Sequence, residues 1–237
     1  IFVSNIPSYF INYPNQSILP FSGISNRKTI HCNENGYYSI YQSDRYGFNN
    51  PDKEWDQNEI EFFLVGDSFV LGNCVNRPND ISSVLRKLSN KSVLNIGYAN
   101  NGPLLEYAGL KEYIIPNIKN IIWFYYETSD LYNLDYEIDV KLLKKYIDDI
   151  NFKQDLVYKQ NKIDKILDEL INEKMKKEDN SKKNFEDKLS FKIKKFINLW
   201  NVREFLYYKD RSKFEKEFSP PIEFIKIIKL AENLASK

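Results

Sequence analysis

One serine of this chain directly follows an apolar stretch. Residues 60–72 read IEFFLVGDSFVLG, with an unbroken apolar run at 62–65 that ends at Gly66. Such runs are typical of strands in parallel sheets, although periodicity alone leaves a buried helix open. If a helix follows, Ser68 lies at the carboxyl end of a strand, where open α/β sheets place reacting groups. There it can act as a nucleophile if a base takes its proton, and its own N–H can serve as an oxyanion donor.

The residues around this serine form a motif. Gly66, Asp67, Ser68 and Gly72 make G-D-S-x-x-x-G, which resembles the first signature block of the SGNH (GDSL-type) hydrolase and acyltransferase superfamily. The alternative is an ordinary strand-to-helix turn in which Asp67 and Ser68 cap the helix. A tripeptide also arises by chance, so the elements around it have to decide.

Strands and helices are expected to alternate after the serine. The expected elements are a helix over 78–88 capped by Asn79 or Asp80, a strand over 91–97, a helix over 104–113 and a strand over 120–126. This alternation predicts an α/β fold with a parallel, doubly wound sheet. We expect a three-layer α/β/α, flavodoxin-like arrangement whose strands all end at one edge.

The turns after the second and third strands extend the resemblance. The second, NIGYANNGP, resembles the SGNH block that supplies a backbone N–H to the oxyanion, and spacing from Asn95 puts the family's glycine at Asn100. Asparagine can adopt the backbone required there. The third, at 126–131, resembles the G-N-D block, with Thr128 in place of glycine and Ser129 in place of asparagine. A serine hydroxyl also donates, but it is shorter and rotates freely.

The expected base is missing from the sequence. The family carries a D-x-x-H pair near its carboxyl end, whereas the one histidine here is His31, which precedes Ser68. His31 is either a hydrogen-bonded structural histidine or a substitute base. A helix over 221–235 should feed another strand. We therefore expect that strand and the D-x-x-H pair to lie beyond Lys237.

The chain is expected to have three parts. These are an irregular amino-terminal arm with short strands (1–59), an SGNH-like α/β domain (60–136 and 219–237), and a helical insertion (137–218). Helical spacing over 139–173 and 185–207, with a charged loop at 176–184, predicts an inserted helical hairpin. It would act as a lid, or pack on the sheet or a partner. The SDRYGFNN segment of the arm is similar to one preceding the serine strand in many SGNH-like proteins. Its Arg45 either orients a group near the site or forms a structural ion pair.

Composition limits the classes of function. The chain has 237 residues, 42% of them hydrophobic, and a net charge of +1 from 34 basic and 33 acidic residues. Such a balance does not predict binding to nucleic acid or to an anionic membrane surface. Cys32 and Cys74 lack metal-ligand spacing and are either free thiols or a disulfide that implies an oxidising compartment. Because the only methionine is Met175, we expect an upstream part to be absent, with a signal peptide, a membrane anchor and a cloning boundary as alternatives.

The resemblance implies a serine-dependent esterase or O-acyltransferase that acts outside the cytoplasm on acyl groups of a carbohydrate or glycoconjugate. The N–H groups of Ser68 and Asn100 and the hydroxyl of Ser129 would hold the oxyanion, with no cofactor or metal. The alternatives are a non-catalytic SGNH-like carbohydrate-binding domain and a flavodoxin-like or nucleotide-binding domain. The last is disfavoured because no Gly-rich phosphate loop follows a strand.

Overall fold

The fold is known from a computed structural model that describes residues 3–4, 18–32, 36–126, 130–185 and 220–236. The chain divides into two compact units, one formed by Ile1–Glu169 with Ile222–Lys237 and the other by Leu170–Pro221. The first unit contains the predicted strands and the serine.

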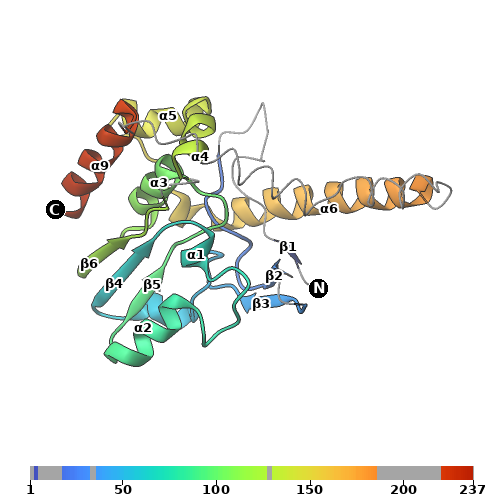
Figure 1. Ribbon diagram of the computed structural model, residues 1–237, viewed down its shortest axis with the longest axis horizontal. Coiled ribbons are helices and arrows are strands. Elements are labelled where there is room, and N and C mark those ends of the chain that lie inside the picture. Colours follow the sequence, from blue (N-terminus) through green and yellow to red (C-terminus); the bar gives the residue numbers. More distant parts are fainter. Residues whose placement is uncertain (1–2, 5–17, 33–35, 127–129, 186–219, 237) are drawn as a thin grey trace, which may run out of the picture. The chain divides into compact units, whose positions relative to one another are not determined.

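A parallel sheet of three strands forms the centre of the first unit. The strands are β4 (Ile60–Val65), β5 (Val93–Asn95) and β6 (Ile118–Trp123), in the order β5-β4-β6 (Figure 1). Phe63 pairs with Leu94 on one side and with Ile121 on the other. Since both pairings are parallel, the carboxyl ends of the three strands meet at one edge. The protein is therefore mixed α/β, with the serine strand in the middle of this sheet.

The described helices of the first unit include α1 (Ser68–Leu71), α2 (Ile81–Ser89), α3 (Pro103–Tyr113) and α9 (Ile222–Ala235). The predicted cap of α2 is confirmed at Asp80, whose side chain accepts the Ser83 N–H. On α2, Leu85 packs against core residues of the sheet, whereas Leu88 is 80% exposed.

The predicted charged loop at 176–184 is wrong. It lies within α6 (Gln160–Phe185), the longest helix that the structure describes. This stretch contains no glycine or proline, and its many lysines and glutamates favour the helix. The predicted second helix at 185–207 falls almost entirely outside the described residues. No described helix combines the length and the apolar character needed to span a membrane.

Shorter elements precede α6. They are α4 (Asp130–Ile138), α5 (Lys141–Asp148) and the 3-10 helix η3 (Leu156–Tyr158). Leu143, Tyr146 and Ile163 are buried among the core residues of the first unit. Since α5, η3 and α6 are separate elements, the region predicted as helical over 139–173 is interrupted before α6 begins.

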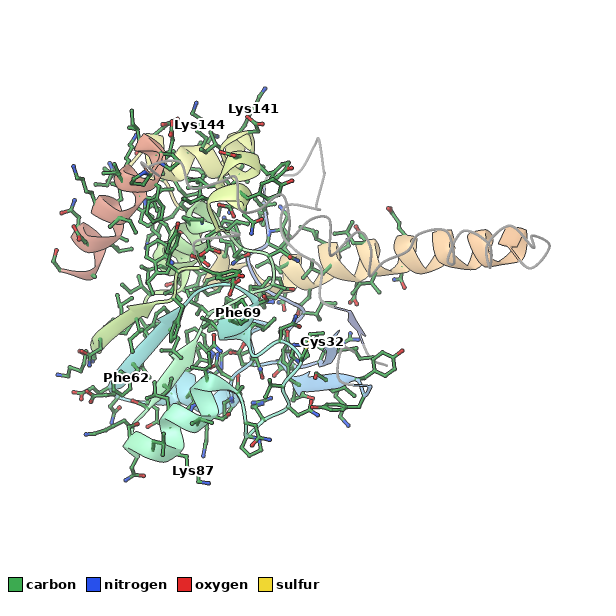
Figure 2. The ribbon with its side chains drawn as sticks, viewed as in Figure 1. Cys32, Phe62, Phe69, Lys87, Lys141 and Lys144 are labelled. Carbon is green, nitrogen blue, oxygen red and sulfur yellow. A yellow bond between two sulfur atoms is a disulfide. The ribbon has the colours of Figure 1, made fainter. Side chains whose placement is uncertain are left out.

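The amino-terminal arm contains short strands, as predicted. These are β1 (Val3–Ser4), β2 (Lys28–Cys32) and β3 (Ser39–Gln42), which form a small sheet in the order β1-β2-β3, and the 3-10 helix η2 (Asp52–Asp56) follows. Cys32, labelled in Figure 2, is bonded to Cys74. Of the two alternatives for these cysteines, the disulfide is thus confirmed, and it ties β2 to the loop after α1.

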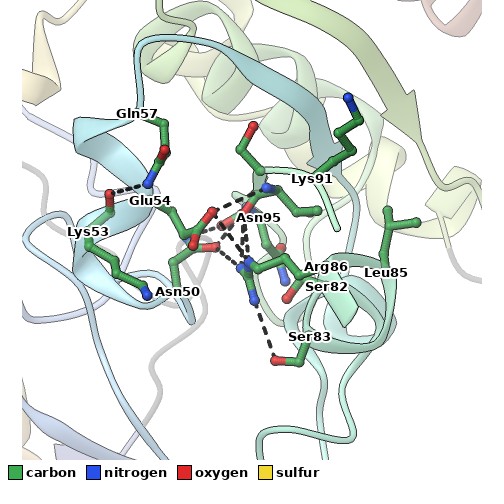
Figure 3. Close-up of polar contacts among 12 residues, drawn as sticks. Asn50, Lys53, Glu54, Gln57, Ser82, Ser83, Leu85, Arg86, Lys91 and Asn95 are labelled. Atoms are coloured by element: carbon green, nitrogen blue, oxygen red, sulfur yellow. Dashed lines mark hydrogen bonds and ion pairs between the residues drawn. The ribbon is translucent and has the colours of Figure 1, made fainter. Parts of the chain in front are cut away.

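A polar network joins the arm to the central sheet (Figure 3). The Asn50 side chain donates to the carbonyl of Asn95 at 2.8 Å and accepts the Asn95 N–H at 2.9 Å. The Arg86 guanidinium donates to the Asn50 side chain at 3.2 Å and pairs with Glu54 at 3.6 Å. Because Asn50 and Glu54 belong to the arm, this network holds the arm against β5 and α2.

Candidate active site at the carboxyl edge of the sheet

Ser68 is the first residue of α1 and follows the end of the central strand β4. Asp67 caps the helix by accepting the Phe69 N–H at 2.9 Å. A Cβ atom on Gly66 would lie 2.4 Å from Cγ2 of Val70. Only glycine therefore lets α1 turn back so tightly over the end of β4. The predicted strand–turn–helix context of the serine is confirmed, and Ser68 itself is half-buried.

The second turn lies directly beside the serine turn. The Tyr98 N–H donates to the carbonyl of Gly66 at 3.2 Å, which continues the β4–β5 pairing beyond the strands. A Cβ atom on Gly97 would lie 2.7 Å from the Leu71 nitrogen, so α1 packs against the backbone of this turn. Asn100 is exposed and has a φ of 59°. The expectation that asparagine adopts the left-handed backbone at this position is confirmed.

Asn95 joins the first two turns through its side chain. Its Nδ2 donates to the carbonyl of Val70 at 2.5 Å, and its Oδ1 accepts the Gly97 N–H at 2.7 Å. The residue is fully buried. The sequence interpretation used Asn95 only to count spacing. A polar residue within a buried apolar strand was the signal that could have identified it, because such a side chain needs internal partners.

The third turn approaches from the other side of β4. The Phe124 N–H donates to the carbonyl of Val65 at 2.9 Å. The ring of Tyr126 lies edge-to-face on Phe69, with 5.3 Å between the ring centroids. Phe69, labelled in Figure 2, is 60% exposed. Ser129, the predicted third oxyanion donor, lies outside the described residues. The structure thus brings together the turns of Ser68 and Asn100 and the start of the third turn.

Buried carboxyl groups surround this edge, and sequence reasoning missed their importance. Asp67, Glu106, Asp130 and Glu137, here called the carboxyl cluster, are each at most 7% exposed. Burial raises the pKa of Asp67, while its bond from the Phe69 N–H acts in the opposite direction. A glutamate in the otherwise largely apolar start of α3 was the one signal in the sequence.

Two residues weighed for the site lie in the arm. Arg45 forms exposed ion pairs with Asp52 at 2.8 Å and Asp56 at 2.7 Å, which confirms the structural alternative. His31 packs edge-to-face on Tyr41, and burial lowers its pKa to about 4. Neither ring nitrogen of His31 has a hydrogen-bond partner within the described part of the chain, so the expectation of a hydrogen-bonded histidine is wrong. It is held by packing.

Within the described ranges, no three histidine, cysteine, aspartate or glutamate side chains are arranged to hold a metal ion. Comparisons with models of protein families, with curated proteins and with solved structures found no match to this chain.

Proposed function

We propose that this chain is a serine-dependent esterase or O-acyltransferase of the SGNH type, with Ser68 as its nucleophile. The observation that carries the proposal is the position of Ser68 at the start of the helix after the central parallel strand. The turn containing Asn100 is hydrogen-bonded to the serine turn. Nucleophiles and ligands of α/β sheets lie at such edges.

The proposed reaction runs through an acyl-enzyme. The Ser68 Oγ attacks the acyl carbonyl while a base takes the hydroxyl proton, and the N–H groups of Ser68 and Asn100 donate to the oxyanion. The base returns the proton to the departing alcohol, and water or a second hydroxyl then releases the acyl group. The family resemblance gives the role of the base to a D-x-x-H pair and adds the hydroxyl of Ser129 as a third donor. Both remain predictions from the sequence.

Two exposed rings support a carbohydrate or glycoconjugate as the substrate. Phe69 and Tyr126 are 60% and 42% exposed, and they pack on one another next to Ser68. Exposed apolar side chains that lie together in one patch, unlike single ones, mark binding surfaces. A sugar ring offers an apolar face to such rings and hydroxyl groups that can bond the Tyr126 phenol.

The wider architecture and the compartment belong to the same proposal. We infer a three-layer, flavodoxin-like arrangement around the parallel sheet, supported by the strand order β5-β4-β6 and by the helical crossovers between the strands. The disulfide between Cys32 and Cys74 supports an oxidising, extracytoplasmic location.

Replacement of Ser68 tests the nucleophile. We expect Ser68→Ala to lower hydrolysis of p-nitrophenyl acetate by at least about a hundredfold, since the acyl-enzyme can no longer form. Ser83→Ala is the matched control because Ser83 also lies in the first turn of a helix, on α2. It should keep wild-type turnover. Equal turnover by wild-type protein and Ser68→Ala would show that the serine is not the nucleophile.

A non-catalytic carbohydrate-binding domain is the second candidate. It is favoured by His31, the only histidine in the sequence, which packs on Tyr41 in the arm. In this case acetylated oligosaccharides would bind to wild-type protein and Ser68→Ala with equal affinity, and neither protein would release acetate. Calorimetry combined with an acetate assay separates the two candidates.

A further inference from the structure

Glu106 differs from the other members of the carboxyl cluster in its hydrogen bonding. Glu137 accepts the N–H groups of Gly102, Leu104 and Leu105, at 2.6, 2.9 and 3.3 Å, at the start of α3. By contrast, Glu106 Oε2 accepts a single bond, from the Trp123 indole N–H at 2.5 Å. Oε1 of Glu106 is buried without a hydrogen-bond partner in the described part of the chain.

Two further members of the cluster also accept backbone N–H groups. Asp130 Oδ2 accepts the Tyr126 N–H at 2.6 Å, and the Tyr126 carbonyl accepts the Asp130 N–H at 3.0 Å. Asp67 caps α1. Hydrogen bonds from N–H groups stabilise a carboxylate, and a buried charge without them is very costly. Within the described part of the chain, Glu106 is the member that accepts no backbone N–H group and has an oxygen without a partner, so it has the least support for a negative charge.

The electrostatic environment of Glu106 agrees with its hydrogen bonding. Burial raises the pKa of Glu106 well above its ordinary value, and the negative charges of Asp130, Glu137 and Asp67 raise it further. The Trp123 bond acts in the opposite direction. Burial also raises the pKa of Glu137, to about 7, although its three N–H donors lower it. Groups from β6, from α4 and from the β4–α1 turn thus all act on the Glu106 carboxyl.

We propose that Glu106 is a proton-dependent positioning residue, which as the neutral acid lets Asp130 remain bound to the Tyr126 N–H beside Ser68. In this state the proton is on Oε1, while Oε2 accepts the Trp123 N–H. Loss of the proton places another buried anion among Asp67, Asp130 and Glu137. Repulsion between these carboxylates then loosens the bond between Asp130 and Tyr126.

This positioning affects the serine in two ways, which rest on the proposed function. Tyr126 packs on Phe69, the residue after Ser68, so movement of Tyr126 changes the surface next to the nucleophile. An additional buried negative charge at this edge also opposes the formation of an oxyanion there. Glu106 acts through Asp130 and Tyr126, and it does not itself contact the substrate.

Tryptophan fluorescence tests the proton on Glu106 without any assay of activity. The chain has three tryptophans, and substituting Trp55→Phe and Trp200→Phe leaves Trp123 as the only one. Titrating this protein from about pH 5 to about pH 9 should give a transition above the ordinary glutamate range. We expect Glu106→Gln to abolish the transition, because glutamine keeps the acceptor for the Trp123 N–H but carries no proton to lose.

The arm supplies a matched control. The Trp55 indole N–H donates to buried Asp44 at 2.7 Å, and burial raises the pKa of Asp44 to about 6. A protein in which Trp55 is the only tryptophan should show its own transition, unchanged by Glu106→Gln. If the Trp123 transition survives Glu106→Gln, or if Trp123 fluorescence stays flat while circular dichroism shows a folded chain, the proposal is wrong.

Two further measurements complete the test. If Glu106→Gln does not fold, carboxyl carbon NMR of wild-type protein labelled in glutamate decides, since the proposal requires a second glutamate, in addition to Glu137, that titrates well above the ordinary range. The pH profile of ester hydrolysis tests the link to the serine. Glu106→Gln should move the alkaline limb of this profile upward by about one pH unit or more. Inactive wild-type protein with an intact Trp123 transition would refute the proposed function but not the protonation of Glu106. An unchanged alkaline limb in active protein would refute the positioning role.

Discussion

At the scale of single residues, Asn95 determines the spacing between two turns of the candidate site. An amide is suited to this position because it offers a donor to the Val70 carbonyl and an acceptor to the Gly97 N–H. An aspartate would lack the donor, and an apolar side chain would leave both backbone groups unpaired in the interior. The polar side chain in this apolar strand is thus explained by the two turns that it joins.

We expect Asn95→Ala to lower the free energy of unfolding by about 2–4 kcal/mol, because two buried backbone groups lose their partners. Urea denaturation measures this change. Asn161→Ala is the control, since Asn161 is exposed near the start of α6. It should stay within about 0.5 kcal/mol of wild type. A similarly small effect of Asn95→Ala would contradict the bridging role.

At the scale of elements, α1 depends on its surroundings. A four-residue helix is too short to form by itself, so Asp67 at its start and the glycine backbones beneath it hold it in place. Gly97 is the one that meets the backbone of α1, because an added Cβ would lie 2.7 Å from the Leu71 nitrogen, whereas a Cβ on Gly66 would first meet the Val70 side chain. A backbone atom cannot rotate away as a side chain can.

Two glycine substitutions test this packing. Gly97→Ala should destabilise the protein by about 1–3 kcal/mol and lower ester hydrolysis, because α1 and Ser68 are displaced. Gly109→Ala, within α3, should be neutral or stabilising by up to about 1 kcal/mol, since its added Cβ meets only Ile96 Cδ1, at 3.9 Å. Thermal unfolding and activity of both variants provide the comparison. Equal behaviour of the two variants would mean that α1 does not rest on Gly97.

At the scale of the whole molecule, buried acids link stability to pH. Burial raises the pKa of Asp44 to about 6 and that of Glu137 to about 7. The unfolded chain loses these protons at lower pH than the folded chain does. Their contribution to stability is therefore complete below about pH 4, the range of the unfolded groups, and is lost as pH rises through about 6 to 7.

We expect the melting temperature to fall overall as pH rises from about 4.5 to about 8, with a loss from Glu137 alone on the order of 3 kcal/mol. Below about pH 6.5 the lowered pKa of His31 acts in the opposite direction, and it offsets only part of the combined loss from Asp44 and Glu137. Glu137→Gln should reduce this slope because its neutral amide has no proton to lose. Glu59→Gln, which alters an exposed carboxyl paired with Lys119, should retain the wild-type slope. If the stability of wild-type protein instead increased over this pH range, buried acids would not be what links its stability to pH.

Much of the fold could be predicted because its signals are local. The apolar run of β4, the cap of α2 and the glycine and asparagine residues of the turns each act within a few residues of themselves. The charged stretch at 176–184 misled the prediction, since polar composition suggests a loop although lysine and glutamate also favour helices. The amphipathic pattern of α2 predicted the helix correctly, but it did not reveal that Leu88 is largely exposed.

Local sequence was enough to predict the strand–turn–helix around Ser68, the left-handed asparagine at position 100 and the alternation of strands and helices. Folding was needed to show that Asn95 joins two turns, that Cys32 is bonded to Cys74, and that four carboxyl groups lie buried at the edge of the sheet. The difference lies in the range of the interactions. Backbone conformation and capping depend on near neighbours, whereas burial and charge repulsion depend on groups that folding brings together from distant positions.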